Sequence, residues 1–391
     1  MAWNMVNVRE QRVQFVVRAK QGQEKLCQLC HEFGISRPTG YRWLERYQEN
    51  GVAGVEERSR RPHNSPRRTA EATEQQIVEL RGQRPDWGAR KLQPLLASQG
   101  VQLPVVTVHR VLLRHGLVRR EDRHAAAVQR FEREVANELW QMDFKSPKGW
   151  DQAVGPLSVI DDHSRYVIAL AQTGTTRTAA VRAQLEAAFG RCGVPQEMLM
   201  DHGTPWWNPA AGGGWTELAV WLMKQGIGLH YGRIRHPQTQ GKVERFHGAL
   251  EMARRRRGLP AAELRQGWLD EFREEYNQVR PHEALGMRTP ASVWHRSARE
   301  YDPNPPQWDY GEAAEVHRVD SHGQVWLAAR RWPISQALRQ EWVEVKRVGQ
   351  RLLVYYRQSL VREIDLAAQR STAVDRWAKP STCNGCVDNE V

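Results

Sequence analysis

Residues 139–144 read Leu-Trp-Gln-Met-Asp-Phe, and residues 198–203 read Met-Leu-Met-Asp-His-Gly. In both segments a short apolar run ends at an aspartate. Such runs, bounded by a turn signal, predict buried β-strands. We therefore expect Asp143 and Asp201 to lie at the ends of two strands in one sheet, where both carboxylates can face a common site.

A third acid, Glu244, follows the polar turn 236–241 and lies in a helix expected to begin near Thr239. Carboxylates that converge from separate elements suit a pair of hard divalent cations. On a basic chain, the natural substrate of such a pair is a phosphodiester. Asp143, Asp201 and Glu244 are therefore the predicted catalytic residues and metal ligands.

Other acids compete for this role. Asp161 and Asp162 occupy a predicted hairpin turn, where aspartate is common for structural reasons. Glu251 lies two turns after Glu244 on the same helix face, and Glu217 fits a solvated helix position. We rank all four below the three chosen acids.

The surrounding pattern predicts an α/β core over residues 137–300. Its order is three strands, then helix, strand, helix, strand and helix, which is the order of a ribonuclease H-like fold. The strands are expected at 140–144, 157–160, 166–171, 197–200 and 228–231, and the helices at 178–189, 215–225, 239–257 and 262–277.

Composition points to a nucleic-acid partner. The 391 residues carry a net charge of +12, and the isoelectric point is near 9.8. Residues 1–136 contain 24 Lys and Arg against 15 Asp and Glu, so the N-terminal third carries most of the excess. A basic excess of this kind indicates a polyanion, and we expect double-stranded DNA.

Other locations and classes are disfavoured. No apolar run approaches the roughly 20 residues of a membrane-spanning helix, and the N-terminus lacks the apolar core of a signal peptide. The five cysteines, an odd number, argue against a disulfide framework. We expect a cytoplasmic protein with no membrane partner.

Residues 1–57 are predicted to form a helix-turn-helix DNA-binding domain, with helices at 8–20, 24–33 and 37–47. Val13, Val16 and Val17 would face inward from the first helix. Gly34 suits the left-handed turn between the last two helices, and Ser36 suits an N-cap. The second helix of such a motif enters the major groove, although a plain three-helix bundle has the same pattern. The expected DNA contacts are Arg37, Thr39 and Arg42.

A basic linker, 58–72, precedes a second helix-turn-helix-like domain, 73–136, whose helices are expected at 73–83, 88–98 and 107–115. The linker arginines could contact phosphate or the minor groove, or remain in a solvated hinge. The predicted DNA contacts of these two segments are Arg60, Arg61, Arg67, Arg68, Arg90, Lys91, Thr107, His109 and Arg110.

The core has its own basic residues, which could contact DNA or form local ion pairs. They are His236, Lys242, Arg245, His247, Arg254 and Arg255. Trp206 and Trp207, beside Asp201, could stack on an unpaired base or pack in the core. Both readings remain open at this level.

A proline-rich linker, 301–314, leads to short strands over 315–367, which predict a small β-barrel. Residues 368–391 are expected to be disordered. Cys383 and Cys386 have a zinc-like spacing without a second ligand pair, so no structural zinc is expected.

Several motifs together resemble the bacterial insertion-sequence transposases of the Asp-Asp-Glu class, whose catalytic core is similar to that of retroviral integrases. The resemblance rests on residues 140–143, 162–165, 201–205, 236–247 and 276–285, and it covers nearly the whole chain. The chain departs from the family in one respect: the loop 206–214 lengthens the spacing between the second and third acids.

The resemblance implies an active site with two Mg²⁺ ions, for which Mn²⁺ could substitute. Asp143 would bridge both ions, and Asp201 and Glu244 would each hold one. It also implies hydrolysis at the transposon end, transfer of the freed 3′-hydroxyl to target DNA, and a dimer or larger multimer on paired ends in the bacterial nucleoid. An inactive DNA-binding regulator and a plain metal-dependent nuclease are the alternatives.

Overall fold

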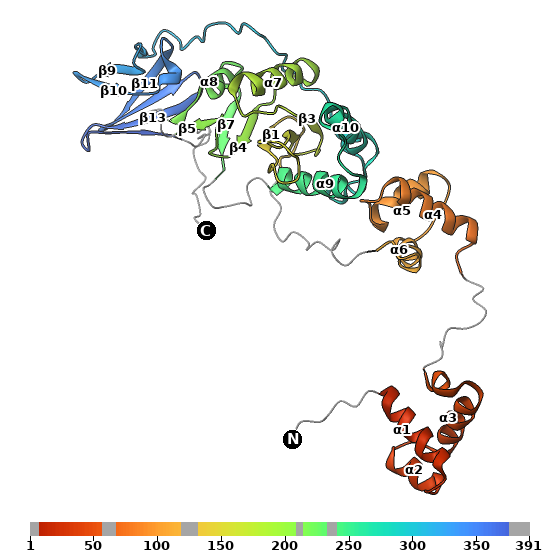
Figure 1. Cartoon of the computed structure of the whole chain (residues 1–391). Helices are drawn as coiled ribbons and strands as arrows, with labels where there is room; N and C mark the ends of the chain where they lie inside the picture. Colours follow the sequence, from red (N-terminus) through yellow and green to blue (C-terminus); the bar gives the residue numbers. More distant parts are fainter. Residues whose placement is uncertain (1–7, 57–67, 119–131, 209–213, 233–240, 375–391) are drawn as a thin grey trace. The chain divides into compact units, whose positions relative to one another are not determined.

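The computed structural model describes residues 8–56, 68–118, 132–208, 214–232 and 241–374. The chain divides into two compact units, Met1–Arg68 and Thr69–Val391 (Figure 1). The predicted linker arginines Arg60, Arg61 and Arg67, residue His236 and the pair Cys383 and Cys386 lie outside the described residues.

The first unit consists of three helices and a final 3-10 turn. They are α1 (Val8–Gln21), α2 (Leu26–Glu32), α3 (Arg37–Asn50) and η1 (Gly51–Val55). Gly34 has a positive φ, and the Ser36 hydroxyl accepts a hydrogen bond from the Thr39 amide at the start of α3, as predicted. Gly40 is required by packing, since a Cβ there would lie 2.6 Å from the Cys30 sulfur.

One inward residue was predicted wrongly. Val16 is fully buried and Val13 is partly buried against the same core, but Val17 is 38% exposed. Phe15 is buried in its place and contacts Phe33 edge-on. The valine pattern alone did not distinguish the two neighbouring faces of this short helix.

The second unit begins with another three-helix bundle, formed by α4 (Glu71–Gln83), α5 (Ala89–Ser98) and α6 (Val105–Arg114). Each helix lies within two residues of its predicted position. Apolar residues at helical spacing form its core, with Trp87, Leu92 and Leu96 fully buried. A single compact core of this size explains why three short helices are stable together.

A five-stranded sheet with the order β3-β2-β1-β4-β7 forms the centre of the second unit. Strand β1 pairs antiparallel with β2 and parallel with β4, and β4 pairs parallel with β7. The strands are β1 (Leu139–Phe144), β2 (Leu157–Asp161), β3 (Val167–Ala171), β4 (Glu197–Met200) and β7 (Gly228–Tyr231).

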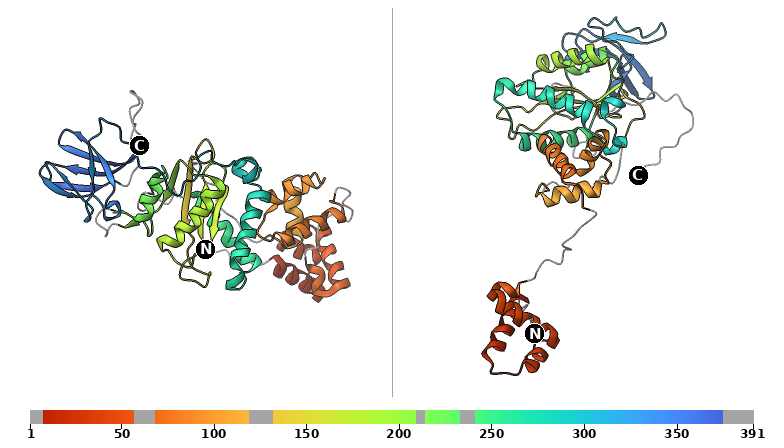
Figure 2. Two further views of the ribbon diagram at one scale, coloured as in Figure 1. Left: turned by 90° about the horizontal axis from the view of Figure 1, so that it is seen from above. Right: turned by 90° about the vertical axis from the view of Figure 1, so that its right-hand side faces the viewer.

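Helices cover both faces of this sheet (Figures 1 and 2). One apolar cluster joins Trp140, Val159 and Met198 of the strands to α7 (Thr178–Cys192) and α8 (Glu217–Lys224). A second joins Ile160 and Val167 to α9 (Gly241–Arg257) and α10 (Arg265–Glu274). Successive strand residues point to opposite faces, so both faces of the sheet are buried, and the predicted ribonuclease H-like order is confirmed.

The segment after α10 continues as a π-helix, Glu275–Val279, which carries Asn277. The Asn277 side-chain oxygen accepts from the Val167 amide at 2.8 Å, and its nitrogen donates to the Val167 carbonyl at 3.0 Å. This amide therefore satisfies both backbone groups at the start of β3 where that edge strand has no further partner strand.

The C-terminal region differs from the predicted closed barrel. It contains an open five-stranded sheet in the order β14-β13-β12-β11-β8 and a separate hairpin of β9 and β10. Within the described residues β8 and β14 do not pair with each other, so the sheet keeps two edges. The strands are β8 (Val316–Arg318), β9 (Gln324–Leu327), β10 (Arg330–Pro333), β11 (Trp342–Val348), β12 (Arg351–Tyr356), β13 (Ser359–Asp365) and β14 (Arg370–Ala373).

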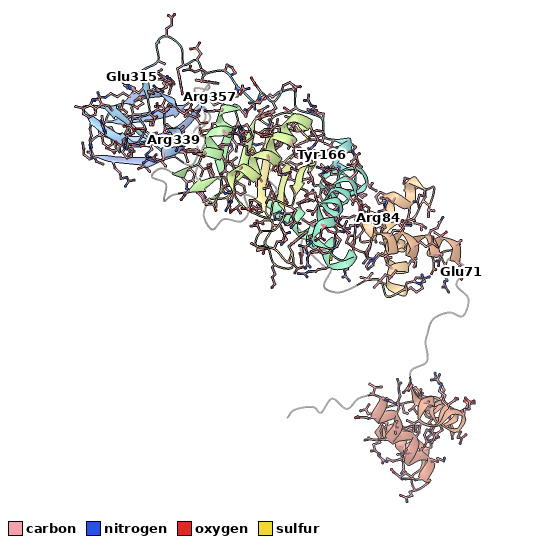
Figure 3. All side chains as sticks on the ribbon, turned by 45° about the horizontal axis from the view of Figure 1, so that its top comes forward. Glu71, Arg84, Tyr166, Glu315, Arg339 and Arg357 are labelled. Atoms are coloured by element: carbon pink, nitrogen blue, oxygen red, sulfur yellow. The ribbon has the colours of Figure 1, made fainter. Side chains whose placement is uncertain are left out.

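Strand β14 also corrects the predicted disorder at Arg370–Ala373, which pair with β13, whereas residues 375–391 of the predicted tail lie outside the described residues. The C-terminal sheet packs against the α8 side of the core, where the Trp215 indole donates to the Val361 carbonyl at 2.9 Å. Arg357, labelled in Figure 3, donates to the carbonyls of Lys224 and Pro306. None of the helices in the described part of the chain is long and apolar enough to cross a membrane.

Replacing Asn277 with alanine should lower the free energy of unfolding by roughly 2–4 kcal/mol, because two buried backbone groups of Val167 lose their partners. Urea unfolding of the full chain measures this change. Gln278→Ala, at the exposed neighbouring position, should change the stability little. Equal effects of the two substitutions would contradict the bridging role of Asn277.

Candidate active site

The sheet brings two of the three predicted acids to one edge. Gln141 of β1 and Leu199 of β4 are partners in the parallel ladder, and two residues later each strand reaches its aspartate, Asp143 or Asp201. Parallel strands end at the same edge of a sheet. The two carboxylates therefore emerge from adjacent strands on the same side.

Helix α9 brings the third acid. It lies across β1 and β2, and the Val243 amide donates to the Gln141 side-chain oxygen at 3.2 Å. This contact sets the first turn of α9, which carries Glu244, over β1, the strand that carries Asp143. Asp201 and Glu244 are exposed, whereas the Asp143 side chain is only 23% exposed.

The three carboxylates influence one another. The pKa of Asp143 is raised to about 7, chiefly because burial disfavours its charge, and further because Asp201 and Glu244 are negative. The amide of Phe144 donates to its Oδ1 atom at 2.8 Å and partly opposes that shift. A carboxylate in these surroundings is stabilised by a bound cation.

The donor set suits a hard divalent cation, because three carboxylates supply only oxygen ligands. The side chains of this structure are not drawn together around an ion: in the described residues no group of three or more His, Cys, Asp or Glu side chains is close enough to enclose one. Asp143, Asp201 and Glu244 are coupled by charge at one sheet edge, with the two exposed acids open to solvent.

Asp201 is held from within its own loop. Its Oδ1 atom accepts hydrogen bonds from the Gly203 amide at 2.8 Å and from the Trp206 indole. Trp206 is 1% exposed and stacks on Phe144 of β1, with ring centroids 5.5 Å apart. Packing, rather than base stacking, is therefore the role of Trp206, and its link to Asp201 was not predicted.

Trp207 is also in the core, in contact with the rings of Trp215 and Tyr231. The extra loop between the second and third acids begins as a two-stranded hairpin, β5 (Trp207–Asn208) with β6 (Gly214–Trp215). Gly214 has a positive φ, and a Cβ there would meet the Trp207 ring. The described part of the loop is thus anchored by aromatic packing.

The rival acids have structural partners. Asp161 is fully buried and accepts from the Ser164 amide and hydroxyl and from the Asn137 amide. Asp162, also fully buried, accepts from the Gln141 side-chain Nε2 and from Lys242. These bonds leave both acids as turn and strand-end residues, as their sequence position indicated.

Glu251 is likewise engaged, by Arg254 at 2.7 Å and Arg255 at 2.8 Å. These two arginines lower the pKa of Glu251 to about 2. Glu251 is therefore engaged by ion pairs within its own helix. Glu244 stays the predicted metal ligand of this helix.

Several predicted DNA contacts within the core are engaged inside the protein. Lys242 is paired with the buried Asp162. His247 is 7% exposed, its Nε2 lies 3.1 Å from the Ser158 hydroxyl, and burial lowers its pKa to about 3. Its Nδ1 lies 3.8 Å from Asp143. The side chain is thus a buried, neutral neighbour of Asp143 in the DNA-free chain, and its phosphate contact stays a prediction. Arg245 is exposed.

In the first unit, Arg37 and Arg42 are exposed on α3, and Thr39 is half-buried with its hydroxyl 2.8 Å from that of Ser36. Arg68 is exposed at the end of this unit. The two arginines therefore remain available to a ligand at the start of the predicted recognition helix.

In the second bundle, His109 and Arg110 are exposed on α6 and Thr107 is half-buried. The other two predicted contacts face the catalytic core instead. Arg90 pairs with Glu283 at 2.9 Å, and Lys91 is half-buried near Arg280, with its pKa lowered to about 8 by burial and by that arginine. Lys91 is thus engaged inside the protein, whereas the Arg90 side chain is 68% exposed in its ion pair, and its DNA contact stays a prediction.

Known domain families match both the N-terminal helical region and the α/β core of the chain. A helix-turn-helix domain matches residues 11–63 and a homeodomain-like domain matches residues 39–112. Two descriptions of the integrase core domain match residues 133–237 and 225–290. The chain is 23% identical over 222 residues to the insertion element IS407 uncharacterized 31.7 kDa protein of Burkholderia multivorans, covering 55% of this chain and 78% of that protein.

The chain belongs to the insertion-sequence transposases with an integrase core domain.

Shorter similarities accompany this one. The transposase is 40% identical over 88 residues to protein YlbG of Escherichia coli, covering 22% of this chain and 72% of that protein. Among solved structures, the HTLV-2 integrase catalytic core domain in complex with magnesium covers 41% of this chain and 99% of its own, at 16% identity and a TM-score of 0.33. The simian T-cell lymphotropic virus intasome matches 78% of this chain and 99% of its own, at 15% identity and a TM-score of 0.36.

Replacing Asp143 with asparagine should stabilise the metal-free transposase. Folding raises the pKa of Asp143 from its ordinary value to about 7, so the free energy of unfolding falls as the pH rises between these two values. Asparagine carries no charge and avoids this loss, a gain of up to about 4 kcal/mol above pH 7 at roughly 1.4 kcal/mol per pKa unit.

Thermal unfolding in EDTA at several pH values measures the effect. The gain should grow from about pH 4 to pH 7, and Asp270→Asn, which removes an exposed acid on α10, should show none of it. A variant no more stable than the parent chain at pH 8 would show that burial and the neighbouring acids do not disfavour the charge of Asp143.

Proposed function

We propose that the transposase hydrolyses the phosphodiester at the end of its element and joins the freed 3′-hydroxyl to target DNA, using two divalent cations held by Asp143, Asp201 and Glu244. The observation that supports it most directly is the electrostatic coupling of the three carboxylates, since Asp201 and Glu244 add to the rise in the pKa of Asp143. The integrase core match over the same residues supports the reaction class.

The reaction is two in-line displacements at phosphorus. Water attacks first, the bond to the 3′-oxygen of the element end breaks, and a 3′-hydroxyl is released. That hydroxyl then attacks a target phosphodiester and displaces a 3′-oxygen of the target strand. Bound Mg²⁺, or Mn²⁺ in its place, would activate the attacking oxygen and stabilise the leaving oxygen. No covalent bond to the enzyme forms.

The protein's own residues orient the ligands. The Gly203 amide and the Trp206 indole fix Asp201, and the Phe144 amide fixes Asp143. His247 fills the space beside Asp143 without adding a positive charge. The acids are thereby held on a rigid sheet edge, which is what a two-cation site requires.

DNA recognition is proposed for the helix-turn-helix domain and for the second bundle. The exposed residues Arg37 and Arg42 on α3, and His109 and Arg110 on α6, would contact the terminal repeats, with the linker between the two modules following the backbone. We also propose that the transposase acts as a multimer on paired ends in the bacterial cytoplasm. We assign residues 1–57 and 73–136 to DNA recognition and residues 137–300 to catalysis.

Asp143→Asn, Asp201→Asn and Glu244→Gln should each reduce cleavage of a linear DNA bearing an element end by about a hundredfold or more, because each removes a metal ligand. Binding to the same DNA should be largely retained. Glu251→Gln is the matched control on α9, since it neutralises the rival acid and should leave cleavage intact. Cleavage that survives in all three variants would reject the assignment.

Trp206→Phe keeps an aromatic ring beside Phe144 but removes the N–H that holds Asp201. The Mg²⁺ concentration for half-maximal cleavage should rise by about tenfold or more, because the orientation of a ligand is lost. Trp215→Phe removes a comparable buried indole N–H, one that donates to the Val361 carbonyl. It should cost similar stability and leave the Mg²⁺ dependence unchanged; equal Mg²⁺ responses of the two variants would contradict a positioning role for Trp206.

A further inference from the structure

Residues 276–285, Tyr-Asn-Gln-Val-Arg-Pro-His-Glu-Ala-Leu, form a closing motif that supplies none of the three carboxylates. Within the core, Asn277 of this motif binds Val167, and Tyr276 packs against Phe246 and Phe272. Val279, Arg280 and Glu283 have a different partner. They meet the bundle of α4, α5 and α6, which belongs to the same compact unit as the catalytic sheet.

A charge cluster centred on a buried aspartate lies at this contact. The Asp86 side chain, between α4 and α5, is fully buried and accepts from Arg257 at 2.7 Å and from Arg280 at 3.1 Å. Arg257 also pairs with Glu275, as does Arg84 at 3.4 Å. Arg84 is labelled in Figure 3 between the bundle and the core. We call these five residues the Asp86 cluster.

Apolar packing surrounds the cluster. Trp87 is fully buried, and the Arg280 guanidinium lies 5.7 Å from its ring centroid and 5.5 Å from that of Tyr276. Val279 of the closing motif packs against the apolar core of the bundle. The motif therefore contributes to the core of the second bundle as well as to its own.

The shared charges of the Asp86 cluster restrict the geometry of this contact. A buried carboxylate shared by two arginines contributes little net stability, but removing one partner leaves uncompensated charges in a dry environment. Such a contact tolerates little sliding or rotation. An interface built this way holds the bundle in one orientation.

Helix α9 connects this interface to the active site. Glu244 lies in its first turn and Arg257 is its last residue. At 1.5 Å per residue the two positions are about 20 Å apart along the helix, which corresponds to about six base pairs of duplex at 3.4 Å each. One rigid element thus carries a predicted metal ligand at one end and the Asp86 cluster at the other.

We propose that the closing motif is the docking site of the second DNA-reading bundle, and that the Asp86 cluster sets the distance between the sequence contacted by α6 and the phosphodiester that is cut. The docked arrangement forms without DNA and does not depend on catalytic activity. Its effect on cleavage rests on the proposed function. His109 and Arg110 on α6 remain exposed for DNA in the docked arrangement.

Two variants of the full chain test the proposal. Asp86→Asn removes the shared carboxylate, and Arg280→Lys keeps the charge but loses the planar group beside Trp87 and Tyr276. Glu271→Gln, which also removes one acid but from an exposed position on α10, is the control. Hydrogen exchange without DNA should rise in residues 84–92 and 276–285 of both variants, while β1 and β4 keep their protection.

The second measurement maps the cleaved phosphodiester at nucleotide resolution on a DNA carrying an element end. The parent chain and Glu271→Gln should cut at one position. The two docking variants should cut at several neighbouring positions, with a rate reduced by about tenfold or more through misplacement of the DNA. A simple loss of folded protein would lower the rate without spreading the positions.

The outcomes separate the two proposals. Unchanged exchange in both variants would reject the docking site. Increased exchange with a single cleavage position and an unchanged rate would reject the distance-setting role. If Asp86→Asn loses protection throughout the chain, Arg280→Lys decides the question. An inactive parent chain in Mg²⁺ and in Mn²⁺ would instead reject the proposed function, and the exchange experiment would still decide the docking.

Discussion

The parallel pairing of β1 with β4 is the constraint on which the active site depends. It sets Asp143 and Asp201 on adjacent strands at one sheet edge, and it buries Asp143 enough to raise its pKa to about 7. Parallel pairing requires a long crossover, which the chain makes through β2, β3 and α7. The electrostatic cost is local, whereas the surrounding apolar clusters on both faces of the sheet hold the arrangement in place.

Much of the basic charge of the chain has an internal role. Arg257 and Arg280 neutralise Asp86, Arg254 and Arg255 neutralise Glu251, and Lys242 neutralises Asp162. The total of 57 Lys and Arg therefore overstates the number of cations available to DNA, although the net charge stays at +12. The exposed cations on α3 and α6 stand out more clearly once these internal pairs are set aside.

The sequence predicted the positions of the core strands and helices well. It predicted poorly which elements contact one another. Periodicity and the turn residues located β1, β4, α7 and α9 to within a few residues, because burial on one or two faces leaves a local pattern. The C-terminal strands show the limit of that reasoning: alternation indicated strands, but an open sheet and a closed barrel have the same alternation. Closure depends on whether β8 and β14 meet, which is a long-range contact.

By itself, the sequence determined which acids lie at strand ends, which helices form the two N-terminal helical modules and which family the core resembles, since each of these depends on local spacing and short motifs. Only the tertiary structure decided that Trp206 holds Asp201, that His247 is buried beside Asp143, and that Asp86 joins the second bundle to the closing motif. Those contacts link residues on different elements, and in the last case residues nearly two hundred positions apart. Their energies depend on burial and on the partner's charge, neither of which a local pattern contains.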